Sequence, residues 1–213
     1  MAIDWFRKTT WTAADREDFE ARLKRSRGVY HKSQYLRIQA SHLESAVLPL
    51  YRDALALLER VLTEWRDDSQ VASALLQKAE CLLATEGFDA AIPVFREGLE
   101  FEMKHTKSRT GAWVAFPWQI VKHQRVDLYD EALRWLASSP TGSIFPVDQF
   151  RVSTVLAVVK MKQGDVVFAK SCAADALKAA AAETSGFRYH QQLGLVGPVE
   201  SWVKMELERI LAA

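Results

Sequence analysis

The sequence of 213 residues contains no asparagine and only two cysteines. Without asparagine there is no acceptor for N-glycosylation. Cys81 and Cys172 have no second cysteine or histidine at metal-ligand spacing, and we expect both to be small buried residues. No apolar run approaches the roughly 18 residues that cross a membrane, and residues 1–8 lack the apolar core of a signal peptide. We therefore expect a protein of the reducing cytoplasm with no membrane partner.

Sequence motifs of catalysis are also missing. There is no HExxH zinc motif, no GxSxG nucleophile elbow and no glycine-rich phosphate loop. The five histidines are scattered, at positions His31, His42, His105, His123 and His190. We expect no catalytic residue, no metal and no cofactor. An enzyme that unites a histidine with carboxylates in a polar pocket is the alternative.

What the chain does contain is helical patterning along almost its whole length. Hydrophobic residues make up 49% and charged residues 26%, which are ordinary values for a globular protein. Apolar residues recur at the spacing of one helix face, and no convincing strand alternation occurs. The sequence therefore predicts an all-α protein of about ten helices.

Capping residues, prolines and glycines mark the ends of these helices. The first helix is predicted to start after Thr12, and prolines are predicted to open three others, at Pro49, Pro146 and Pro198. Glycines are predicted to end helices at Gly28, Gly87 and Gly164. Pro93 lies inside a helical pattern, so that helix should begin late or bend there. We expect a kink at Pro117 in a helix from about residue 112 to 126.

Alanines recur with a period typical of helical repeats. In the second helix of each pair they are spaced by 37, 41 and 37 residues, at Ala54, Ala91, Ala132 and Ala169. In the first helix they lie one and then two periods apart, at Ala40, Ala79 and Ala157, with Trp118 at the position between. Two helices approach closely only where side chains are short. The period therefore indicates helix pairs that stack on one another.

Around these alanines the sequence resembles the tetratricopeptide repeat family. The best match is the unit Leu75, Ala79, Leu82, Gly87, Phe88, Ala91, Phe95, Gly98 and Leu99, and the next is Leu156, Ala157, Gly164, Asp165, Ala169, Ala176 and Leu177. The resemblance covers about residues 33 to 180. The period exceeds the family's 34 residues, and Lys78 and Lys160 replace usual apolar residues. The resemblance implies a right-handed α-solenoid of antiparallel helix pairs, with HEAT-like repeats as the alternative.

We expect this solenoid to be a single domain over residues 1–213. Residues 1–28 would form an N-terminal segment with the first helix, residues 29–184 about four degenerate helix pairs, and residues 196–213 a C-terminal capping helix. Trp5, Phe6 and Trp11 are expected to pack on the first helices as part of the cap, with an exposed docking patch as the alternative.

Local charge is more informative than the formal net charge of +1. Residues 22–43 contain six basic residues and no acid, with Tyr30 and Tyr35 among them. Residues 103–126 contain five basic residues and no acid, beside Trp113, Phe116 and Trp118. These stretches could seat an acidic partner segment. In the alternative, the aromatic side chains belong to the core and the cations are solvated.

The resemblance implies a non-enzymatic module that binds a partner protein or peptide, as a scaffold, a chaperone or an immunity-type protein. The residues expected to line its concave surface are Gln34, Arg37, Ser41, Gln77, Glu80, Lys122 and His123. Binding of single-stranded nucleic acid by the same basic and aromatic residues is a second alternative, which the near-neutral net charge disfavours.

Overall fold

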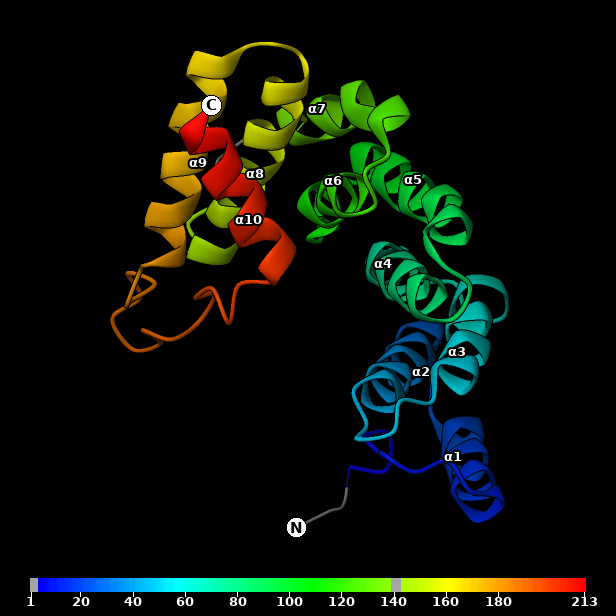
Figure 1. Ribbon diagram of the computed structural model, residues 1–213. Coiled ribbons are helices and arrows are strands. Elements are labelled where there is room, and N and C mark those ends of the chain that lie inside the picture. Colours follow the sequence, from blue (N-terminus) through cyan, green and yellow to red (C-terminus); the bar gives the residue numbers. More distant parts are fainter. Residues whose placement is uncertain (1–3, 139–142) are drawn as a thin grey trace. The chain divides into compact units, whose positions relative to one another are not determined.

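The computed structural model describes residues 4–138 and 143–213, and every regular element within them is a helix (Figure 1). The elements are α1 (Ala13–Arg25), α2 (Val29–Glu44), α3 (Tyr51–Thr63), α4 (Asp68–Thr85), α5 (Phe88–Lys104), α6 (Ala112–Lys122), the short 3₁₀ helix η1 (Val126–Leu128), α7 (Tyr129–Ala137), α8 (Pro146–Lys162), α9 (Val166–Ala180) and α10 (Ser201–Ala212). The predicted all-α fold of about ten helices is confirmed. Within the described ranges, no helix is both long and apolar enough to cross a membrane.

Several helix ends follow from local chemistry. Thr12 and Asp15 form a capping box at α1, in which the Asp15 N–H donates to Thr12 Oγ1 at 3.2 Å and the Thr12 N–H donates to Asp15 Oδ2 at 2.9 Å. Pro146 opens α8, where the missing N–H has no cost. Gly87 separates α4 from α5 with φ at +93°, a value that glycine adopts without strain.

Other predicted ends are wrong. The helix α3 begins at Tyr51, two residues after Pro49, because Leu50 is not helical (φ −104°, ψ 57°). The helix α10 begins at Ser201, because the Glu200 carbonyl, and not Pro198, accepts its first hydrogen bonds. Of the two outcomes expected at Pro93, a late start or a bend, the late start does not occur, because α5 begins at Phe88 and continues through Pro93.

The chain divides into two compact units, and unit 1 is Met1–Ala112. In it, α2 packs against α3 and α4, α3 against α4, and α4 against α5. Trp5 contacts the rings of Phe19 and Tyr35, with ring centroids 5.2 and 4.9 Å apart. The buried amide of Gln39 exchanges two hydrogen bonds with the Lys8 backbone. The segment before α1 therefore covers the first helices, as predicted for the aromatic cap.

Unit 2 is Trp113–Ala213. In it α8 packs against α9, and α10 lies against both helices (Figure 1). The connection from α9 to α10 is held to the start of α8 at Gly194, whose carbonyl accepts from the Val147 N–H at 2.8 Å. A Cβ at Gly194 would overlap the ring of Phe145, which stacks on Phe187. The loop is thus part of the packing of this unit.

The seven alanines of the repeat are all completely buried. Ala40, Ala54, Ala79, Ala91, Ala132, Ala157 and Ala169 each have 0% exposure. Close packing at such positions also involves Gly98 of α5, where an added Cβ would lie 3.4 Å from Leu75 Cβ of α4. Cys81 and Cys172 are buried and free. The seven alanines therefore lie in the core, where short side chains allow helices to approach closely.

A leucine at a repeat alanine should destabilise the fold. We expect Ala91→Leu to lower the free energy of unfolding by about 1–3 kcal/mol, because the larger side chain overpacks a completely buried position. The matched control is Ala56→Leu on an exposed position of α3, which should change stability little. Urea unfolding followed by circular dichroism measures both, and equal stabilities of the two variants would contradict close packing at Ala91.

Candidate functional site

Five of the seven residues predicted to bind a partner lie in unit 1. Gln34, Arg37 and Ser41 are on α2, whereas Gln77 and Glu80 are on α4. The two helices are in contact. The other two predicted residues belong to unit 2, where Lys122 ends α6 and His123 follows it. Each group is therefore described in its own unit.

The polar side chains that α2 and α4 carry on their adjoining faces form what we call the α2–α4 seam. On α2 they are Gln34, Arg37, Ser41 and Glu44, and on α4 they are Gln70, Gln77 and Glu80. The spacings of three and four residues on α2, and of seven and three residues on α4, place each set on one helix face. The buried amide of Gln70 accepts a hydrogen bond from Arg37 Nε at 2.8 Å. This bond joins the two helices and fixes the guanidinium group.

Arg37 is the only cation of the seam, and it has no carboxylate partner among the described residues. The side chain is half-buried, and burial lowers the pKa of the guanidinium group, which stays protonated at neutral pH. Nearby, Gln34 Nε2 donates to the Tyr30 hydroxyl at 3.3 Å. The Oε1 atom of Gln77 is buried without a hydrogen-bond partner. The seam therefore keeps unused hydrogen-bonding capacity.

The far end of the seam is acidic. Burial, followed by the nearby charge of Glu80, raises the pKa of Glu44 to about 7. Beneath them lies the thiol of Cys81, whose pKa rises to about 12 because it is buried and close to both carboxylates. Glu44 therefore titrates near neutral pH, whereas the thiol stays protonated. The seam has a cationic part and a part with a titratable negative charge.

The titration of Glu44 predicts a stability that depends on pH. Because the folded-state pKa of about 7 exceeds the ordinary value of about 4.5 for a glutamate, the folded state binds this proton more tightly. The contribution of this proton to the free energy of unfolding is complete below the pKa of the unfolded state and is lost as the pH rises through 7. Between about pH 5 and pH 8 we expect the wild type to lose about 1–2 kcal/mol relative to Glu44→Gln.

Urea titrations at a series of pH values measure this difference. The matched control is Glu97→Gln, which removes an exposed carboxylate of α5 and should leave the pH profile of the wild type unchanged. A difference between wild type and Glu44→Gln that stays constant with pH would contradict the expectation.

In unit 2, Lys122 has a structural partner. Its Nζ lies 2.7 Å from Glu200 Oε2, and this carboxylate also accepts from Trp202 Nε1 at 3.1 Å. The Lys122 hydrogen bond is the main cause that lowers the pKa of Glu200. Lys122 therefore ties the end of α6 to the start of α10, a role that the sequence did not indicate. His123 is exposed beside it.

The aromatic side chains of the two basic stretches are mostly in the core. Phe116 and Trp118 are buried, and Trp118 contacts Phe150 and Trp202 with centroids 5.8 and 5.4 Å apart. Tyr35 belongs to the aromatic cluster under Trp5. Of the six cations in residues 22–43, Arg22 pairs with Asp18, and Lys32 lies 3.9 Å from the centre of the Trp65 ring. These aromatic residues are therefore not a continuous surface for bases.

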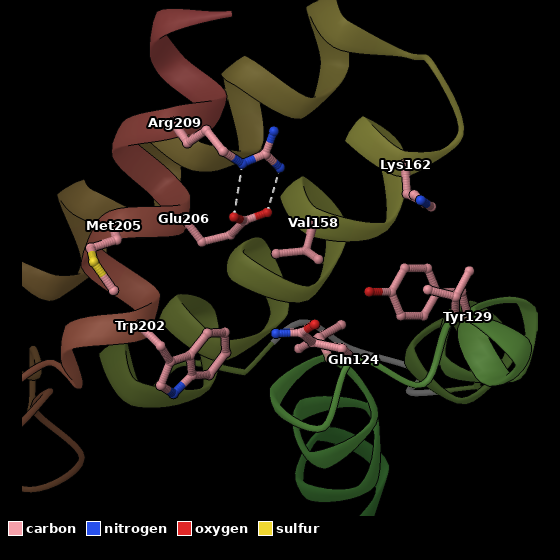
Figure 2. Close-up of a pocket in the computed structure, with 10 residues that line it drawn as sticks. Gln124, Tyr129, Val158, Lys162, Trp202, Met205, Glu206 and Arg209 are labelled. Carbon is pink, nitrogen blue, oxygen red and sulfur yellow. Dashed lines mark hydrogen bonds and ion pairs between the residues drawn. The ribbon is translucent and has the colours of Figure 1, made fainter.

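Unit 2 also contains a pocket of about 430 Å³, which we call the α10 pocket (Figure 2). Residues at the end of α6, the start of α7, and along α8 and α10 line it. Val121, Val158, Trp202 and Met205 provide apolar surface, and Gln124, Tyr129, Lys162, Glu206 and Arg209 provide polar groups. These residues are up to 88 positions apart, between Val121 and Arg209, so no local motif predicts the pocket.

Gln124 has an unusual backbone conformation at the edge of this pocket. Its φ is +52°, and it is the only non-glycine residue with positive φ among the described residues. The Gln124 N–H donates to the Val121 carbonyl, and the next N–H donates to the Ile120 carbonyl. The turn at Gly164 has the same two bonds, with φ at +85°. Gln124 therefore occupies the position that Gly164 fills after α8. This turn ends α6 at Lys122, before the predicted residue 126.

Glycine at this position should relieve the strain. We expect Gln124→Gly to raise the free energy of unfolding by about 1 kcal/mol, the cost of a left-handed conformation for a residue with a Cβ. The reciprocal variant Gly164→Gln should lower it by a similar amount. Chemical unfolding measures both changes, and a loss of stability in Gln124→Gly would show that the glutamine side chain stabilises the turn by more than its strain.

Comparison of the chain with protein-family models, with curated proteins and with solved structures finds no match.

Proposed function

We propose that this chain is a non-enzymatic module that binds an acidic segment of a partner protein or peptide on the α2–α4 seam. We also propose that its helix pairs form a right-handed solenoid similar to tetratricopeptide repeats, and that it acts in the cytoplasm. The packing of α2, α3, α4 and α5 in sequence, together with the burial of the periodic alanines, supports the solenoid. Scaffold, chaperone and immunity-type roles all use such a surface.

The observation that carries the proposed function is the state of Arg37. A half-buried cation with no carboxylate partner has lost part of its hydration without electrostatic compensation. Gln70 holds its Nε at 2.8 Å, so the two Nη groups are preorganised and make no hydrogen bond to a described residue. A carboxylate can accept from both Nη groups of one guanidinium in a bidentate pair. An acidic side chain of a partner would therefore supply the missing countercharge.

The rest of the seam favours an extended peptide over a single carboxylate. Gln34 and Ser41 lie one helical turn on either side of Arg37 on the same face of α2, and Gln77 lies on the adjacent helix. Amide and hydroxyl groups of this kind hydrogen-bond a peptide backbone without selecting its sequence. Glu44 and Glu80 at the acidic end would repel a segment that is acidic throughout. We therefore expect a segment with its carboxylates near Arg37 and a neutral or basic residue at the acidic end.

Charge reversal at Arg37 should remove this binding. In a library of short fluorescent peptides with acidic, neutral and basic sequences, we expect the wild type to select peptides with a carboxylate. Arg37→Glu should weaken the best of them at least about tenfold, because it replaces a desolvated attraction by repulsion. Fluorescence anisotropy titrations measure the affinity.

The matched control is Arg52→Glu, which reverses an exposed cation on α3 and changes the net charge equally. Equal weakening by both substitutions would show that the loss of peptide affinity comes from the change in net charge alone. Absence of acidic-peptide binding by the wild type would contradict the proposed function. Retention of single-stranded RNA with a steep salt dependence would instead favour the nucleic-acid alternative.

A further inference from the structure

We infer that the α10 pocket is a binding site for a small organic anion that has an aromatic body and one carboxylate. The inference goes beyond the proposed function, because the pocket lies in unit 2 and receives a small molecule. Its volume of about 430 Å³ is within the range of roughly 300–1,000 Å³ that is typical of ligand sites.

The apolar walls of the pocket suit a flat ring. Trp202 provides an indole whose Nε1 is held by Glu200 at 3.1 Å and whose ring lies 5.4 Å from that of Trp118. Met205, 64% exposed, lies beside it on α10 (Figure 2). A thioether next to an indole offers favourable contacts to an aromatic ring. A ligand ring here would also cover the side chain of Met205 from water.

The hydroxyl of Tyr129 offers a hydrogen-bond donor at the wall of the pocket. Tyr129 is only 7% exposed, its hydroxyl is directed into the pocket (Figure 2), and it makes no hydrogen bond to a described residue. A hydroxyl at the wall of a pocket can donate a hydrogen bond to a ligand oxygen. Burial, and then the charge of Glu206, raises the pKa of Tyr129, so the hydroxyl stays protonated and can donate. A ligand oxygen at this point would satisfy it.

The charges of the pocket favour a negative ligand. Glu206 accepts two hydrogen bonds from Arg209, at 2.9 Å from Nε and 2.6 Å from Nη2 (Figure 2). This pair is neutral overall. Lys162 at the edge of the pocket forms no ion pair with a described residue, and the side chain of Gln124 contributes an amide. The pocket therefore has a net positive charge and an excess of donors, which a carboxylate complements.

The strained backbone of Gln124 is consistent with a ligand contact. The equivalent turn after α8 uses Gly164, which adopts the same conformation without cost. At Gln124 the chain instead keeps a side chain that lines the pocket. Left-handed residues with a Cβ are held at a cost, and they concentrate where a side chain contacts a ligand.

The experiment is a titration of the ¹⁵N-labelled full chain with 3-phenylpropionate and with 3-phenylpropionamide, followed by two-dimensional NMR. We expect saturable shifts of the Trp202 indole and of backbone amides around the pocket. The acid should bind about tenfold more tightly than the amide, the effect of one charge-assisted hydrogen bond. Lys162→Glu should remove this preference, and Tyr129→Phe should weaken the acid several-fold.

The matched control is Lys178→Glu, which reverses an exposed cation on α9 and should leave both affinities unchanged. Absence of saturable shifts, shifts outside the pocket, or equal affinity for acid and amide would overturn the inference. A peptide with adjacent internal phenylalanine and glutamate serves as a third probe. Binding of this peptide without binding of 3-phenylpropionate would also overturn it, in favour of docking of a partner chain.

Discussion

The close approach of helices at completely buried alanines is the constraint on which the rest of the structure depends. Two helices whose contact positions carry only a methyl group can bring their backbones together, and their neighbouring side chains then face one another directly. In unit 1, α2 packs against α3 and α4, and Arg37 reaches Gln70 across 33 positions of sequence. A bulkier contact would separate the two polar rows of the seam. The alanines thus determine the geometry of the polar surface as well as the core.

Several charged side chains of unit 1 are paired with one another. Lys8 lies within 3.2 Å of both Asp15 and Asp18, Arg60 is held by Glu20 and Glu64, and Arg16 pairs with Asp53. Exposed pairs of this kind contribute little to stability, but they reduce the field around each ion. Arg37 is half-buried and has no carboxylate partner among the described residues, and Lys162 at the α10 pocket forms no ion pair with a described residue. In a chain with a net charge of +1, the surroundings of such cations indicate a binding site better than the total charge does.

Local signals predicted the fold well, whereas the sites depend on contacts that are distant in sequence. Thr12 with Asp15, Pro146 and Gly87 mark helix ends because their effect depends only on adjacent backbone groups. Pro49 and Pro198 misled because a proline fixes its own φ but does not supply the carbonyl that starts a helix. Helical spacing placed Arg37 on a shared face with Gln34 and Ser41. Nothing local could reveal the bond of Lys122 to Glu200, 78 positions away, or the pocket that α10 completes.

The two buried thiols provide a separate reporter for each half of the chain. Cys81 lies in unit 1 and Cys172 in unit 2, and burial raises the pKa of both. A thiol reagent reacts only with the exposed thiolate, so modification of each cysteine requires its own unit to open. The rates at the two cysteines therefore measure the opening of each unit in one sample, without any added label. Binding at the α2–α4 seam would slow the first rate, and occupation of the α10 pocket would slow the second.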